Sequence, residues 1–142
     1  MNQDQRAVRL AAALRDSESE SWSRRAAAGR QLAAWVEREE VGPVIERLLL
    51  DPHDTAVTQE TAQALLERRY LVGLRAVLAA LSRAEEWSTA DQLDGEVLDY
   101  QSWMIADDRR DEFVDQLVGL AADQDEGVRD EALRLSRLRE QP

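Results

Sequence analysis

The sequence predicts an all-α protein, an α-α superhelix of about four helical hairpins, from three observations. Alanine (21 residues) and leucine (19 residues) favour helices and outnumber the 17 Val, Ile and Thr residues that favour strands. Only 6 Gly and 3 Pro interrupt the 142 residues, too few for the many tight turns of a β-sandwich. Apolar helical positions also recur about every 35 residues, which is typical of stacked helical repeats.

Apolar periodicity and end chemistry divide the first half of the chain into four helices, expected at residues 3–15, 22–39, 43–50 and 55–69. Ser21 and Asp54 precede two of them and have side-chain oxygens that can cap a helix start. Gly42 and Pro43 separate the second helix from the third, and proline is favoured in a first helical turn.

The second half predicts four more helices, at residues 72–85, 90–104, 109–122 and 126–139. Thr89 and Asp91 lie at the start of the second of these, Asp107 and Asp108 precede the third, and Asp125 precedes the last. Several helices in both halves end in arginine. Acids at helix starts and bases at helix ends complement the helix dipole, by about 0.3–1 kcal/mol for each group.

Four apolar residues recur at almost equal spacing near the starts of alternate helices. These anchors are Trp22, Val57, Leu93 and Val128, at intervals of 35, 36 and 35 residues. Residues four and seven places after each anchor lie on the same helical face, so we expect this face to be buried. The period predicts one domain, residues 1–142, built from units at about 3–40, 43–70, 72–105 and 109–139.

The last unit resembles the HEAT repeat, whose turn and second helix read Asp, then Val-Arg, then Ala, then Leu. Here these residues are Asp123, Val128-Arg129, Ala132 and Leu135. Unit two is similar in Asp51-Pro52, Val57 and Leu65. The resemblance implies a HEAT-like α-solenoid whose second helices line the inner surface. A tetratricopeptide array has a similar period, but its Gly-and-aromatic first helix and its periodic closing proline are absent.

Motifs that carry catalysis or hold metals are weak in this sequence. There is no cysteine, and the one histidine, His53, lies in an expected turn. The run Asp107–Asp111 matches the aspartate-rich pattern with which isoprenoid synthases hold magnesium diphosphate, but acids at a helix start explain it more simply. No apolar stretch approaches the roughly 20 residues of a membrane span. We expect a cytoplasmic protein that is not an enzyme and has no metal, no cofactor and no membrane partner.

The net charge of -11 is distributed unevenly along the chain. Residues 1–84 hold 12 acids and 12 Arg, whereas residues 85–131 hold 16 acids and 3 Arg, a net charge of -13. An acidic surface repels the phosphate backbone, so we expect no nucleic-acid partner. The acidic C-terminal half predicts instead a protein partner with a basic surface, because complementary charge speeds and orients association.

Seven residues are candidates for binding this partner. Six lie on the expected inner surface, namely Trp35, Gln63, Tyr70, Asp91, Asp99 and Asp130, and the seventh, Asp94, belongs to the acidic stretch. Trp35 and Tyr70 each follow an anchor by thirteen residues and are therefore expected to be neighbours. The sequence thus predicts a non-catalytic protein–protein interaction module. The alternatives are an immunity or inhibitor protein against a basic toxin or nuclease, and an enzyme similar to the bilin lyases that occur on HEAT-like scaffolds.

Overall fold

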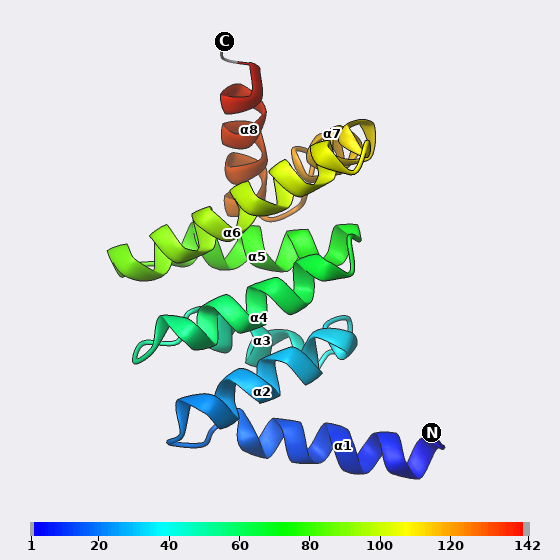
Figure 1. Cartoon of the computed structure of the whole chain (residues 1–142), viewed down its shortest axis with the longest axis vertical. Helices are drawn as coiled ribbons and strands as arrows, with labels where there is room; N and C mark the ends of the chain where they lie inside the picture. Colours follow the sequence, from blue (N-terminus) through cyan, green and yellow to red (C-terminus); the bar gives the residue numbers. More distant parts are fainter. Residues whose placement is uncertain (1, 141–142) are drawn as a thin grey trace.

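The computed structural model describes residues 2–140, with side chains up to residue 138, and all its regular structure is helical, as predicted (Figure 1). Eight α-helices follow one another along the chain: α1 (Gln3–Asp16), α2 (Trp22–Leu32), α3 (Gly42–Leu49), α4 (Thr55–Glu67), α5 (Leu71–Arg83), α6 (Trp87–Ala106), α7 (Arg110–Leu120) and α8 (Glu126–Glu140). Seven helices begin within one residue of the expected positions, and α6 begins three residues early. Three predicted caps, Ser21, Asp54 and Asp125, accept hydrogen bonds from backbone N–H groups of the helices they precede.

The expected helix 22–39 is wrong in its last turns. After Leu32 the chain forms a short 3-10 helix, η1 (Ala33–Trp35), and then a turn that leads to α3. Val36 and Val41 are both buried. Residues five apart on a continuous α-helix point in different directions, so burying both side chains requires the helix to end. Tertiary packing has overridden a sequence with no local helix breaker before Gly42.

The second helices stack in the predicted way over the first three units. Helix α2 packs on α4, and α4 packs on α6, in succession along the molecule (Figure 1). Small residues of α2 make the first of these contacts close. A Cβ atom added at Gly29 would collide with the Thr61 side chain of α4, because it would lie only 3.0 Å from the Thr61 Cβ atom.

The last unit departs from this stacking, since α8 packs against α5 and α7 and runs along the long axis of the molecule (Figure 1). Two arginines of α5 hold the α7–α8 turn in place. Arg75 makes two hydrogen bonds to Asp123, at 2.8 and 3.0 Å, and Arg83 pairs with Asp125. Gly127 then brings the first turn of α8 directly against Ser82 of α5.

Three of the four predicted anchors are core residues. Val57, Leu93 and Val128 are fully buried, as expected, but Trp22 is 51% exposed. Ala26 and Gly29, four and seven residues after Trp22, are buried, so the expected face of α2 begins one turn late. In the first turn of α2 the buried residue is Arg25, not Trp22.

Arg25 closes the α1–α2 hairpin onto the next unit. Its guanidinium donates to both carboxylate oxygens of Asp51, at 2.8 and 3.2 Å, and to the carbonyl oxygens of Ser19 and Glu20. Asp51 also accepts hydrogen bonds from the backbone N–H groups of the following turn. The aspartate that the repeat pattern placed in this turn is therefore a buried ion-pair partner between two units.

Candidate functional site

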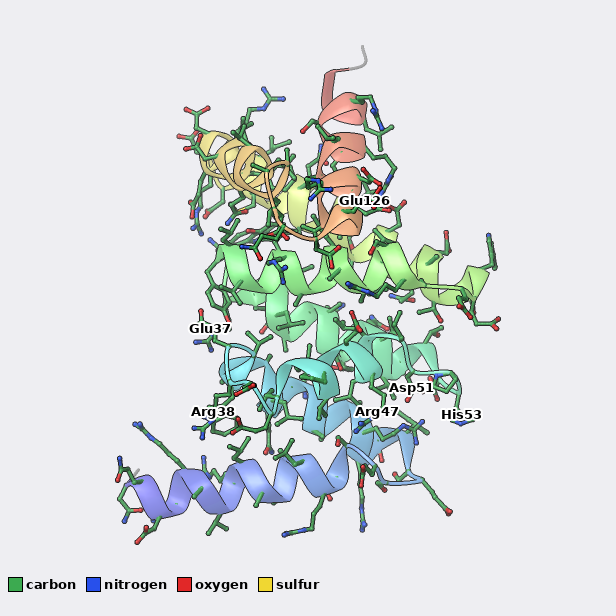
Figure 2. The ribbon with its side chains drawn as sticks, turned by 180° about the vertical axis from the view of Figure 1, so that it is seen from behind. Glu37, Arg38, Arg47, Asp51, His53 and Glu126 are labelled. Atoms are coloured by element: carbon green, nitrogen blue, oxygen red, sulfur yellow. The ribbon has the colours of Figure 1, made fainter. Side chains whose placement is uncertain are left out.

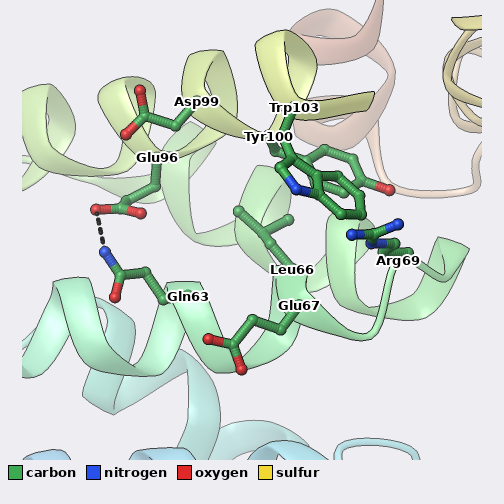
Figure 3. A pocket seen from close by; sticks show the side chains of 8 residues that line it. All are labelled: Gln63, Leu66, Glu67, Arg69, Glu96, Asp99, Tyr100 and Trp103. Atoms are coloured by element: carbon green, nitrogen blue, oxygen red, sulfur yellow. Dashed lines mark hydrogen bonds between the residues drawn. The ribbon is translucent and has the colours of Figure 1, made fainter. Parts of the chain in front are cut away.

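Two of the seven candidates, Gln63 and Asp99, line one pocket between α4 and α6 (Figure 3). We call it the α4–α6 pocket, and its volume is about 350 Å³. It combines acidic, aromatic and aliphatic side chains from the two helices and the turn after α4: Gln63, Leu66, Glu67, Arg69, Glu96, Asp99, Tyr100 and Trp103. On α6 the polar and aromatic residues 92, 96, 99 and 103 follow helical spacing, which places them on one face toward α4.

Glu96 is the most unusual residue of the pocket because its carboxylate is buried without a cationic partner. Glu96 as a whole residue is only 6% exposed. The Oε1 atom accepts hydrogen bonds from the amides of Gln63, at 3.3 Å, and Gln92, at 3.0 Å. No arginine of the described residues pairs with it. Burial raises the pKa of the Glu96 carboxyl, the two amides oppose the shift, and the charges of Asp99 and Glu60 add to it.

This raised pKa predicts a pH-dependent stability effect. The folded state binds the Glu96 proton more readily than the unfolded state does, so the stabilisation it provides at low pH is lost as pH rises through the folded-state pKa. We expect Glu96→Gln to raise the free energy of unfolding relative to the wild type more at about pH 7 than at about pH 4. Urea unfolding at both pH values measures this, with the exposed Glu67→Gln as the control. An equal effect of Glu96→Gln at both pH values would contradict it.

The other end of the pocket is a rigid polar wall around Arg69. The Arg69 guanidinium lies over the Trp103 ring and pairs with Asp107 at 2.8 Å. The Arg69 backbone carbonyl accepts a hydrogen bond from Gln116 of α7, whose side-chain oxygen accepts one from the Tyr100 hydroxyl. Burial raises the pKa of Tyr100, so its hydroxyl stays protonated and able to donate. The positive charge at this end is thus already engaged, and the uncompensated charge lies at the Glu96 end.

The acidic half is partly neutralised by arginines from the first half, which a count along the chain does not reveal. Arg69, Arg75 and Arg83 pair with Asp107, Asp123 and Asp125. Asp94 pairs with Arg134 of α8 at 2.7 Å, so this candidate does not present a free charge. Asp91 and Asp130 are exposed on α6 and α8, and neither lines the α4–α6 pocket.

Trp35 and Tyr70 line one groove together, and it is a different groove from the pocket that Gln63 and Asp99 line. This groove has a volume of about 730 Å³ and lies between α1, η1 and the turn after α4. We call it the α1 groove. Its charged lining residues are Arg6, Arg38, Arg68 and Glu37. The structure therefore separates the seven candidates into two surfaces of different charge.

The weak motifs of the sequence have structural roles or stay exposed. His53 is exposed on the turn after α3, at the edge of the molecule (Figure 2). In the aspartate-rich run, Asp107 pairs with Arg69 and Asp108 has a positive φ of 59° in the turn before α7. Nowhere in the described part do three His, Asp or Glu side chains gather as a metal site requires. Of the described helices, not one combines the length and hydropathy that a membrane crossing needs.

Sequence reasoning missed Glu96, Tyr100 and Trp103 as members of the site. Tyr100 falls seven residues after the Leu93 anchor, so it was expected on the buried face, and it is 5% exposed. One signal was available: Gln92, Glu96, Asp99 and Trp103 form a polar and aromatic stripe at i, i+4, i+7 and i+11.

Comparisons of the chain with protein-family models, curated proteins and solved structures found no match.

Proposed function

We propose that this chain is a HEAT-like, non-catalytic interaction module that binds a protein with a basic surface. The α4–α6 pocket receives an arginine or lysine side chain of that partner. The observation that carries this proposal is Glu96, which is 6% exposed and whose carboxylate is held by two amides but by no cation of the described residues.

A bound cation would remove an energetic cost that the free protein bears. Burying a charge without a partner is unfavourable, whereas an ion pair with additional hydrogen bonds offsets much of that penalty. Gln63 and Gln92 both donate to Oε1 of Glu96, so Oε2 accepts no hydrogen bond from the described residues. Asp99 and Glu67 line the same pocket and supply further acceptors.

The apolar and aromatic walls of the pocket suit the stem of a long basic side chain. Leu66, Tyr100 and Trp103 can pack against methylene groups while the charged end reaches Glu96. Arginines in well-packed pockets are among the residues that dominate binding energies at interfaces. Exposed acids outside the pocket, such as Asp91 and Asp130, would guide a basic partner toward it.

The test is capture of partners by variants of the full chain. We expect the wild type to retain basic proteins from a lysate of the organism that encodes it. The triple variant Glu67→Gln, Glu96→Gln, Asp99→Asn should retain at least about tenfold less, since losing one buried charge-pair partner costs about 3–5 kcal/mol. Retention should also fall as salt rises, because the Debye length shortens from about 10 Å at 0.1 M to about 3 Å at 1 M.

The matched control is Glu37→Gln, Glu39→Gln, Glu40→Gln, which removes the same charge from exposed positions outside the pocket. This control should retain the same proteins as the wild type. Equal losses in both triple variants, or a captured partner with an acidic binding surface, would contradict the proposal. A captured toxin or nuclease would place the same pocket in an immunity protein.

A further inference from the structure

The α1 groove differs from the rest of the molecule in shape and charge. In Figure 1 α1 and α2 diverge from their connecting turn, and Glu37 and Arg38 lie on the same side of the molecule as the start of α1 (Figure 2). The groove occupies the space between the N-terminal part of α1 and η1. Its volume of about 730 Å³ is roughly twice the 350 Å³ of the α4–α6 pocket.

The floor of the α1 groove is an apolar face of α1 that the described residues cover only in part. Ala7, Leu10 and Leu14 follow helical spacing on α1 and line the groove together with Trp35 and Tyr70. Leu10 is 8% exposed, whereas Ala7, one turn earlier, is exposed. The face that packs on α2 therefore continues beyond its contact with α2.

The rim of the groove is basic although the chain carries a net charge of -11. The charged residues that line the groove are three arginines, Arg6, Arg38 and Arg68, and one acid, Glu37. Arg38 pairs with Glu40, and Arg68 lies over the Tyr70 ring at 5.4 Å. Among the ion pairs of the described residues, none involves Arg6 or Arg68. Both guanidinium groups are thus available to a carboxylate.

We propose that the α1 groove binds an acidic amphipathic helix of a partner protein. Two helices that diverge around an apolar floor offer the groove in which an amphipathic helix lays its apolar face. The charge of the rim selects glutamate and aspartate on the flanks of that helix. A second copy of this chain is the alternative occupant that the experiment distinguishes. This surface is independent of the cation pocket and does not rest on the function proposed for it.

The probe is a pair of fluorescein-labelled amphipathic peptides with identical leucine positions, one with glutamate and one with lysine on the polar face. Fluorescence anisotropy of the full chain should show that the glutamate peptide binds. Arg6→Glu combined with Arg68→Glu should weaken that binding at least about tenfold, and circular dichroism should show unchanged helix content since both side chains are exposed. Any binding of the lysine peptide should strengthen in this double variant, because the rim becomes acidic.

The matched control is Arg9→Glu combined with Arg24→Glu, which changes the net charge equally at exposed positions outside the groove. It should leave binding of the glutamate peptide within a factor of a few of the wild type. No binding of that peptide, or equal weakening in both double variants, would overturn the proposal. Self-association that Arg6→Glu and Arg68→Glu abolish would replace the partner helix by a second copy. Binding of phosphatidylglycerol vesicles, but not of the peptide, would replace it by a membrane surface.

Discussion

Replacement of Arg25 by methionine is expected to lower the free energy of unfolding by about 3–5 kcal/mol, because it leaves the Asp51 carboxylate buried without its cation. The two side chains are only 11% and 5% exposed. Methionine fills similar space but donates none of the four hydrogen bonds that Arg25 makes to Asp51, Ser19 and Glu20. Urea unfolding followed by circular dichroism measures the loss.

The control for Arg25 is Arg30→Gln, because Arg30 of α2 also pairs with an acid of the next unit, Glu60 of α4, but in solvent. The side chains of Arg30 and Glu60 are 50% and 39% exposed, so this change should cost about 0–1 kcal/mol. Adding Asp51→Asn to Arg25→Met should recover part of the loss, since it removes the unpaired charge. Equal costs for Arg25→Met and Arg30→Gln would show that the buried pair has no special role in joining units one and two.

Gly73→Ala is expected to destabilise the fold by about 1–3 kcal/mol, because a methyl group at this position has no space. Its Cβ would collide with the backbone carbonyl oxygen of Leu65 and lie 3.2 Å from the Tyr70 ring. A backbone carbonyl cannot rotate away as a side chain can, so α4 and α5 must separate. That movement displaces the turn that carries Arg69 and Tyr70, and therefore disturbs both the α4–α6 pocket and the α1 groove.

Gly95→Ala provides the matched control within α6. An added Cβ there meets nothing within 4 Å, so the better helix propensity of alanine should raise the free energy of unfolding by about 0.5–1 kcal/mol. Thermal or urea unfolding of the two variants should therefore show shifts of opposite sign. A stabilising Gly73→Ala would contradict the close approach of α4 and α5.

Much of the fold could be predicted because it depends on local patterns. Helix positions follow from apolar spacing and caps, and Asp54 and Asp125 act at the helix starts where the sequence places them. The end of α2 could not be predicted in this way. Its cause is the burial of Val36 and Val41 by other parts of the chain. Residues 33–41 include no glycine or proline that would predict the end of the helix.

The candidate site was only partly predictable, for a related reason. Helical spacing and the repeat register placed Trp35 and Tyr70 on one surface, and both residues line the α1 groove. The sequence could not show that Gln63 and Asp99 belong to a different surface, because that depends on where α2 ends and how α1 diverges. Nor could it identify Glu96, since a glutamate on an amphipathic helix is ordinarily exposed and only the contact of α4 with α6 buries this one.

The sequence by itself determined the all-α class, the succession of eight helices and the aspartates in the repeat turns, because these depend on residues within a few positions of each other. The tertiary structure alone decided the partners of those residues. Helix α8 packs on α5 instead of continuing the regular stack, and Arg75 and Arg83 of α5 pair with Asp123 and Asp125, which neutralises part of the acidic half. Charge counted along a chain is a local sum, whereas ion pairing and burial depend on distances between segments that only folding brings together.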